Sequence, residues 1–96
     1  MSQPEFTATG VRIDRWPRSL TRAGEVRIED GRFALLTSYG SEIDSAPLGS
    51  VRAGRPWFAK ADEAVATVNG TRYRISGSAS GRMLDALRKA VSRSRS

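Results

Sequence analysis

Hydrophobic residues alternate with polar ones along most of the chain, which is the pattern of half-buried β-strands. Two dipeptides that favour tight turns, Asp30-Gly31 and Asn69-Gly70, interrupt this alternation. Both suit two-residue hairpin loops, whose central residues take positive φ angles. Because such a loop determines which residues lie opposite each other, each predicted hairpin is tested by its flanking sequence.

The flanks of Asp30-Gly31 agree with a hairpin. In the register of a two-residue loop, Glu29 lies opposite Arg32, which is a favourable cross-strand pair of charges. The same register brings four apolar residues to the other face: Val26, Ile28, Phe33 and Leu35. The alternation and the turn therefore predict the same pair of strands.

The flanks of Asn69-Gly70 agree with a second hairpin. One face holds apolar side chains and a tyrosine: Ala64, Ala66, Val68, Tyr73 and Ile75. The other face holds mostly polar side chains: Val65, Thr67, Arg72 and Arg74. This pattern indicates an antiparallel pair with one buried and one solvated side.

Three further segments extend the predicted sheet. Thr9–Trp16 alternates with a period of two and is expected to form a strand. Pro47 separates Ser41–Ala46 from Leu48–Ala53, and a proline at this place favours kinked or edge strands.

The period changes near the C-terminus, where apolar residues recur at the spacing of a helix face: Met83, Leu84, Leu87, Ala90 and Val91. We expect one amphipathic helix from about Ser80 to Ser92, with Ser78 or Ser80 as its N-terminal cap. Asp85 and Lys89 form an i, i+4 pair in the favourable orientation.

The predicted fold class is α+β and mainly β. It is a curled antiparallel sheet, or a partly open barrel, of six to seven strands capped by one C-terminal helix. A chain of 96 residues is the size of one domain. We place that domain at residues 23–93, after a basic arm of residues 1–22 with room for one strand, and before a frayed basic tail, residues 94–96.

Cysteine and histidine are both absent from the sequence. Disulfides, thiol nucleophiles and imidazole bases are therefore excluded, together with the usual zinc ligands. Carboxylates occur in pairs at Glu29-Asp30, at Asp62-Glu63, and at Glu42 with Asp44, but turns and solvated strand faces explain them more simply. We expect a protein that is not an enzyme and that needs no metal or cofactor.

The net charge of +6 is concentrated at the two ends of the chain. Residues 1–22 carry four basic and two acidic side chains, and residues 82–96 carry five and one. Residues 23–81 carry seven of each sign, so the body of the domain is expected to show no basic bias. Basic ends that keep a small domain soluble explain this excess, and contact with phosphates is the alternative.

A basic stripe along the predicted helix is the candidate anion-binding surface. It consists of Arg82, Arg88, Lys89, Arg93 and Arg95. Such a stripe would bind an anionic lipid, or nucleic-acid phosphates without base specificity, whereas its simpler interpretation is a solvated helix face.

Cationic and aromatic residues also occur together around a break at Pro56. Arg52, Arg55, Trp57 and Phe58 would form a partner-binding hot spot if they were exposed, because tryptophan and arginine are enriched in such sites. If the two aromatic side chains are buried, they instead fill the core.

The order of these segments resembles the pleckstrin-homology-like superfold, in particular its bacterial and GRAM-like members. The resemblance rests on Gly24–Ile28, Gly31–Leu36, Ala46–Val51, Asn69–Ile75 and Ala86–Val91. It implies seven strands in two bent sheets, closed at one end by the C-terminal helix. Eukaryotic members that bind phosphoinositides carry basic residues around the first hairpin loop. Here Glu29 lies beside the Asp30-Gly31 turn and no lysine is near it, which argues against a phosphoinositide site.

The leading hypothesis is a non-catalytic binding or adaptor module that docks on a protein partner or an anionic surface. The second hypothesis is a small basic protein that associates with nucleic acid through its arginine-rich ends. The sequence contains neither an apolar run that could span a bilayer nor the apolar core of a signal peptide, so we expect a cytoplasmic protein.

Overall fold

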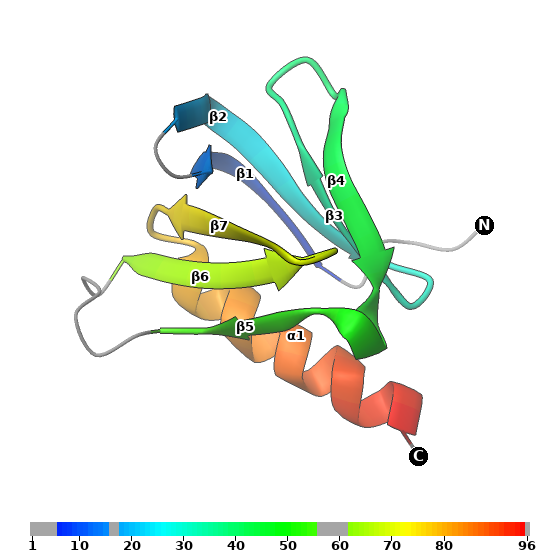
Figure 1. Cartoon of the computed structure of the whole chain (residues 1–96). Coiled ribbons are helices and arrows are strands. Elements are labelled where there is room, and N and C mark those ends of the chain that lie inside the picture. The colour runs from blue at the N-terminus through cyan, green and yellow to red at the C-terminus, as the bar shows by residue number, and fades with distance from the viewer. Residues whose placement is uncertain (1–5, 16–17, 56–61, 96) are drawn as a thin grey trace.

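Seven strands and one helix make up the computed structural model, which describes residues 6–15, 18–55 and 62–95. For Val91 and residues 93–95 the description is limited to the backbone. In chain order (Figure 1) the elements are β1 (Phe6–Arg15), β2 (Arg18–Glu29), β3 (Arg32–Leu36), β4 (Glu42–Pro47), the 3₁₀ turn η1 (Leu48–Ser50), β5 (Arg52–Gly54), β6 (Glu63–Val68), β7 (Thr71–Ser76) and α1 (Ser80–Arg95).

The strands form one antiparallel sheet in the order β4-β3-β2-β1-β7-β6-β5, which does not close into a barrel. The predicted fold class is therefore confirmed. β4 and β5 lie at the two edges of the sheet, and β4 ends at Pro47. An edge position agrees with the prediction from Pro47, because proline cannot donate a hydrogen bond to a neighbouring strand.

Both predicted hairpins are confirmed in their exact register. In β2–β3, Ile28 lies opposite Phe33 and Glu29 opposite Arg32. In β6–β7, Ala66 lies opposite Tyr73. The turn residues all take positive φ angles: Asp30 (52°), Gly31 (75°), Asn69 (51°) and Gly70 (79°).

The core lies between the inner face of the curled sheet and the apolar face of α1. Phe33, Ile13 and Ile75 are fully buried strand residues in this core. The helix contributes Met83, Leu84, Leu87 and Ala90. In Figure 1, α1 runs below the sheet, and it contacts η1, β6, β1, β2 and β5. The apolar stripe predicted for this segment thus covers one side of the sheet.

Residues 6–15 and 18–22 belong to the sheet itself and are not an appended arm. β1 is its central strand and pairs with β2 on one side and β7 on the other. The boundary that we expected after residue 22 falls inside β2. Alternation predicts that Thr9–Trp16 is extended, but it cannot predict pairing with β7, which lies near the other end of the chain.

The helix differs from its prediction at both ends. It continues to Arg95, so Ser94 and Arg95 are helical and not part of a frayed tail. No glycine or proline follows Ser92 to end the helix. At the other end, the Ser80 hydroxyl oxygen is buried without a hydrogen-bond partner and does not cap the helix.

A cluster of hydrogen bonds joins edge strand β4 to the β6–β7 turn. The Tyr73 hydroxyl donates to Asp44 Oδ2 over 2.7 Å, and Asn69 Nδ2 donates to Asp44 Oδ1 over 2.7 Å. Asn69 Nδ2 also donates to the Ser45 carbonyl over 2.8 Å. Burial, followed by the hydrogen bond to Asp44 and its negative charge, raises the pKa of Tyr73 to about 12. Asp44 is therefore a structural carboxylate.

Candidate functional site

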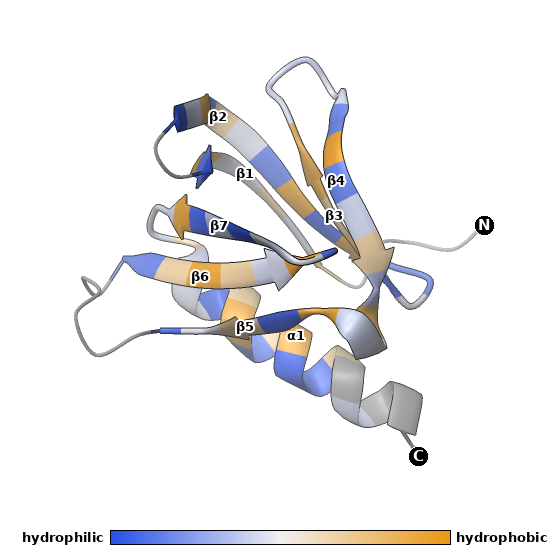
Figure 2. Cartoon of the chain, in the orientation of Figure 1, coloured by the Kyte–Doolittle hydropathy of each residue, from blue (hydrophilic) through white to orange (hydrophobic). Residues whose placement is uncertain are grey.

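An open groove of about 1340 Å³ lies on the face of β1, β7, β6 and β5 that points away from the core. Its charged lining consists of seven arginines and two acids: Arg12, Arg15, Arg18, Arg52, Arg55, Arg72, Arg74, Asp14 and Glu63. Figure 2 shows hydrophilic segments on β5 and β7 in this part of the sheet. We call this feature the arginine groove.

Strand alternation turns these arginines outwards. Arg72 and Arg74 are exposed because the residues between and after them, Tyr73 and Ile75, are buried in the core. Pairing then aligns arginines from separate strands, since Thr67 lies opposite Arg72 on one side and opposite Arg52 on the other. Arg52 and Arg72 thus lie in one row across three strands.

A few of these arginines have an acidic partner. Arg12 Nε lies 3.2 Å from Asp14 Oδ1, and Arg74 Nε lies 3.8 Å from Glu63 Oε2. Arg55 Nε donates to the Glu63 backbone carbonyl over 3.1 Å. Four exposed arginines of the groove make neither a salt bridge nor a side-chain hydrogen bond with any described residue: Arg15, Arg18, Arg52 and Arg72. Positive charges lining one hollow reinforce each other and attract anions.

The expectation that the body of the domain carries no basic bias is wrong. Arg52, Arg55, Arg72 and Arg74 all come from the stretch of residues 23–81 that is neutral in composition. Five of the seven acids of that stretch lie on β2, β4 or the β2–β3 turn: Glu25, Glu29, Asp30, Glu42 and Asp44. Folding therefore separates charges that cancel along the chain.

The arginine groove includes half of the predicted partner-binding set. Arg52 and Arg55 line it, whereas Trp57 and Phe58 lie outside the described residues. The predicted combination of arginines and aromatic side chains therefore stays a prediction.

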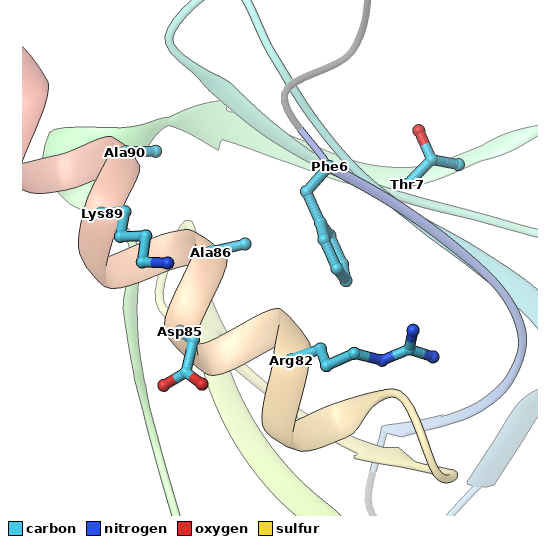
Figure 3. Close-up of a pocket in the computed structure, with 7 residues that line it drawn as sticks. All are labelled: Phe6, Thr7, Arg82, Asp85, Ala86, Lys89 and Ala90. Atoms are coloured by element: carbon cyan, nitrogen blue, oxygen red, sulfur yellow. The ribbon is translucent and has the colours of Figure 1, made fainter.

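Only part of the predicted anion-binding stripe on α1 lines a groove. Arg82 and Lys89 line a second groove, between α1 and β1, with a volume of about 540 Å³ (Figure 3). Arg88 is exposed and is not among the lining residues of either groove. The side chains of Arg93 and Arg95 lie outside the described part of the chain.

The first hairpin of the sheet is not the one at Asp30-Gly31. β1 and β2 are connected at residues 16–17, with Arg15 and Arg18 on the two sides of the connection. The acidic turn at Asp30-Gly31 connects β2 to β3. The absence of lysine at that turn therefore says nothing about the first hairpin, which is flanked by arginines.

The acidic side chains form no metal-binding cluster within the described residues. No group of three or more potential ligands converges there. Asp14 and Glu63 are each in a salt bridge with an arginine, and Asp44 accepts the hydrogen bonds described above. No helix in the same part of the chain is long and apolar enough to cross a membrane.

Comparison of the chain with protein-family models, curated proteins and solved structures found no match. The resemblance to the pleckstrin-homology-like superfold therefore stays a prediction. The argument for function rests on the geometry and charge of the site.

Proposed function

We propose that this protein is a non-catalytic binding module whose arginine groove binds the phosphodiester backbone of a nucleic acid. The observation that carries the proposal is the gathering of seven arginines and two acids on one hollowed face. Each guanidinium presents a planar set of donors that matches the oxygens of a phosphate. The strand order and the C-terminal helix also support placing the chain in the pleckstrin-homology-like superfold.

The composition of the groove favours a nucleic acid over a protein partner. Stable protein interfaces have an apolar core that often includes aromatic side chains. Among the described lining residues, the apolar side chains are only Ala53 and Val65, and none is aromatic. Interfaces with nucleic acids are more polar and much more positive. Hydroxyl groups of Ser19, Thr67 and Thr71 in the same lining are typical phosphate contacts.

The shape of the groove favours a strand over a membrane surface. A bilayer presents a plane of headgroups, and proteins that lie on it insert apolar side chains beside their basic residues. Here the arginines surround a hollow, and the described lining offers no large apolar group to insert. Contacts to phosphates carry no base information, so we expect binding without sequence preference.

The test is the binding of fluorescein-labelled oligothymidine to the full chain, followed by fluorescence anisotropy at several salt concentrations. If each of the four groove arginines that make neither a salt bridge nor a hydrogen bond with a described residue neutralises one phosphate, the association constant falls about fiftyfold between about 50 and 200 mM salt. Duplex DNA, anionic vesicles and an acidic peptide are measured in parallel.

Two double variants with the same net charge test whether the arginine groove is the surface that binds the oligonucleotide. Arg52→Gln with Arg72→Gln removes two groove arginines, and we expect the salt slope to fall by about one per arginine. Arg32→Gln with Arg88→Gln removes two exposed arginines outside the groove and should change affinity little. Equal weakening by both pairs would contradict a role for the groove. Tighter binding of vesicles would assign the arginine groove to a membrane surface, and tighter binding of the acidic peptide would assign it to a protein partner.

A further inference from the structure

The groove between α1 and β1 has a different character from the arginine groove. Its lining residues come from the start of β1 and from one side of the helix: Phe6, Thr7, Arg82, Asp85, Ala86, Lys89 and Ala90. Its volume of about 540 Å³ lies within the range of pockets that hold ligands. We call it the helix groove.

The floor of the helix groove is apolar. The half-buried ring of Phe6 points into the space between β1 and α1, and the methyl groups of Ala86 and Ala90 point towards it (Figure 3). Ala86 and Ala90 are one turn apart on the same helix face. Because both side chains are small, they leave room between the helix and the ring.

Two cations border this apolar floor. Arg82 and Lys89 are seven residues apart on α1, which places them two turns, or about 10 Å, from each other along the helix axis. Neither makes a salt bridge with a described residue. The Asp85 carboxylate points away from Phe6 in Figure 3. The i, i+4 salt bridge predicted between Asp85 and Lys89 is not formed, which leaves the Lys89 ammonium available to a ligand.

We propose that the helix groove binds an acidic amphipathic helix of a protein partner. The partner would present two carboxylates seven residues apart, with apolar side chains three and four residues after the first. This spacing places all four groups on one helix face and matches the separation of Arg82 and Lys89. An extended peptide does not fit as well, because carboxylates three residues apart would span the distance but point to opposite faces.

This inference does not rest on the arginine groove. The two grooves share no lining residue, so both can be occupied at once. A protein with a phosphate-binding groove on its sheet and a peptide-binding groove along its helix would act as an adaptor between a nucleic acid and an acidic protein.

The experiment is a titration of the isotope-labelled full chain with three synthetic alanine-based helical peptides, followed by amide NMR. The first peptide carries two glutamates seven residues apart and two leucines between them. The second has lysine in place of glutamate, and the third has serine in place of leucine. We expect only the first to bind and to shift the signals of Thr7, Ala86, Lys89 and Ala90.

Two charge-reversal variants on α1 form the matched comparison. Lys89→Glu places a carboxylate beside the groove and should weaken the first peptide about tenfold. Arg88→Glu makes the same change of charge on the neighbouring residue, which does not line the groove, and should leave affinity within about twofold. Ala86→Phe fills the space opposite Phe6 and should abolish binding, with thermal unfolding as the check that the variant folds.

Three results would overturn the proposal: no shift with the first peptide, equal binding of the serine peptide, or shifts at Thr67 and Arg72 in place of the helix groove. Excess unlabelled oligothymidine separates this test from that of the proposed function. We expect oligothymidine to leave the peptide affinity unchanged, and the peptide result stands even if oligothymidine itself fails to bind.

Discussion

Charged residues are arranged differently on the outer faces of two parts of the sheet, the β2–β3 hairpin and the β5–β7 part that carries the arginine groove. On β2 and β3, charges of opposite sign are neighbours. Glu25 and Arg27 form a salt bridge of 2.6 Å, and Glu29 lies opposite Arg32 across the hairpin. On β7 and β5, Arg72 and Arg74 share one strand, and Arg52 lies in the same row as Arg72.

The difference indicates what each half is for. Neighbouring charges of opposite sign stabilise a pair of strands, whereas like charges on one face destabilise it. The β2–β3 half therefore has the arrangement expected from stability alone. In the half with the arginine groove, neighbouring arginines repel each other, and dissolved salt or an anionic ligand would weaken that repulsion.

The largest expected effect on stability comes from removing the hydrogen bonds by which Asp44 joins β4 to the β6–β7 hairpin. Asp44→Ala leaves the buried Tyr73 hydroxyl without its acceptor and removes one of the two acceptors of the Asn69 amide, which keeps the Ser45 carbonyl. We expect the free energy of unfolding to fall by about 3 kcal/mol, measured by urea denaturation. Glu42→Ala removes an exposed carboxylate from the same strand and should change stability little. Equal losses in the two variants would contradict the role of the cluster.

The same junction makes stability depend on pH in the alkaline range. The pKa of Tyr73 rises from 10.0 to about 12 on folding, so the fold favours the protonated phenol. Its contribution to stability is complete below pH 10 and is lost as the pH rises towards 12. Urea denaturation across this range should show the loss.

Tyr73→Phe is the control for this pH dependence. It should lower stability by about 1.5 kcal/mol at neutral pH, because the hydrogen bond to a charged acceptor is lost. It should also remove the part of the alkaline dependence that Tyr73 causes. An unchanged alkaline profile in this variant would assign the dependence to other groups.

The smallest expected effects on stability come from two single arginine variants, one in each half of the sheet. Arg72→Gln relieves repulsion in the arginine groove and should raise the free energy of unfolding by about 0.3 kcal/mol at low salt. Arg27→Gln breaks the salt bridge to Glu25 and should lower it by about 0.5 kcal/mol. Both changes should shrink in high salt, because screening weakens interactions between exposed charges. Changes of the same sign would contradict the comparison.

Local features of the fold were predictable because short-range chemistry determines them. The Asp30-Gly31 and Asn69-Gly70 turns need positive φ angles, and a two-residue loop then leaves one register for each hairpin. The apolar face of α1 follows from its helical spacing alone. Of the two serines predicted as the helix cap, Ser78 or Ser80, Ser80 does not fill that role, because its hydroxyl oxygen is buried without a hydrogen-bond partner among the described residues.

The arginine groove could not be predicted from the chain. Its arginines come from β1, the start of β2, β5 and β7, and they meet only because β1 pairs with β7 in the middle of the sheet. Counting charges by segment assigned the basic excess to the two ends and missed the four arginines contributed by residues 23–81. Two local signals pointed to parts of the site: alternation predicted that Arg72 and Arg74 point outwards, and Arg52 and Arg55 belonged to the predicted partner-binding set.

By itself, the sequence determined the hairpins, their registers, the inward and outward faces of each strand, and the amphipathic helix. Turn geometry and the periods of strands and helices act over a few residues and need no distant contact. Tertiary structure alone decided that residues 6–15 form the central strand of the sheet, that Asp44 joins its two halves, and that the arginines share one face. Each of these depends on pairing between segments far apart in the chain, which packing of the whole core selects.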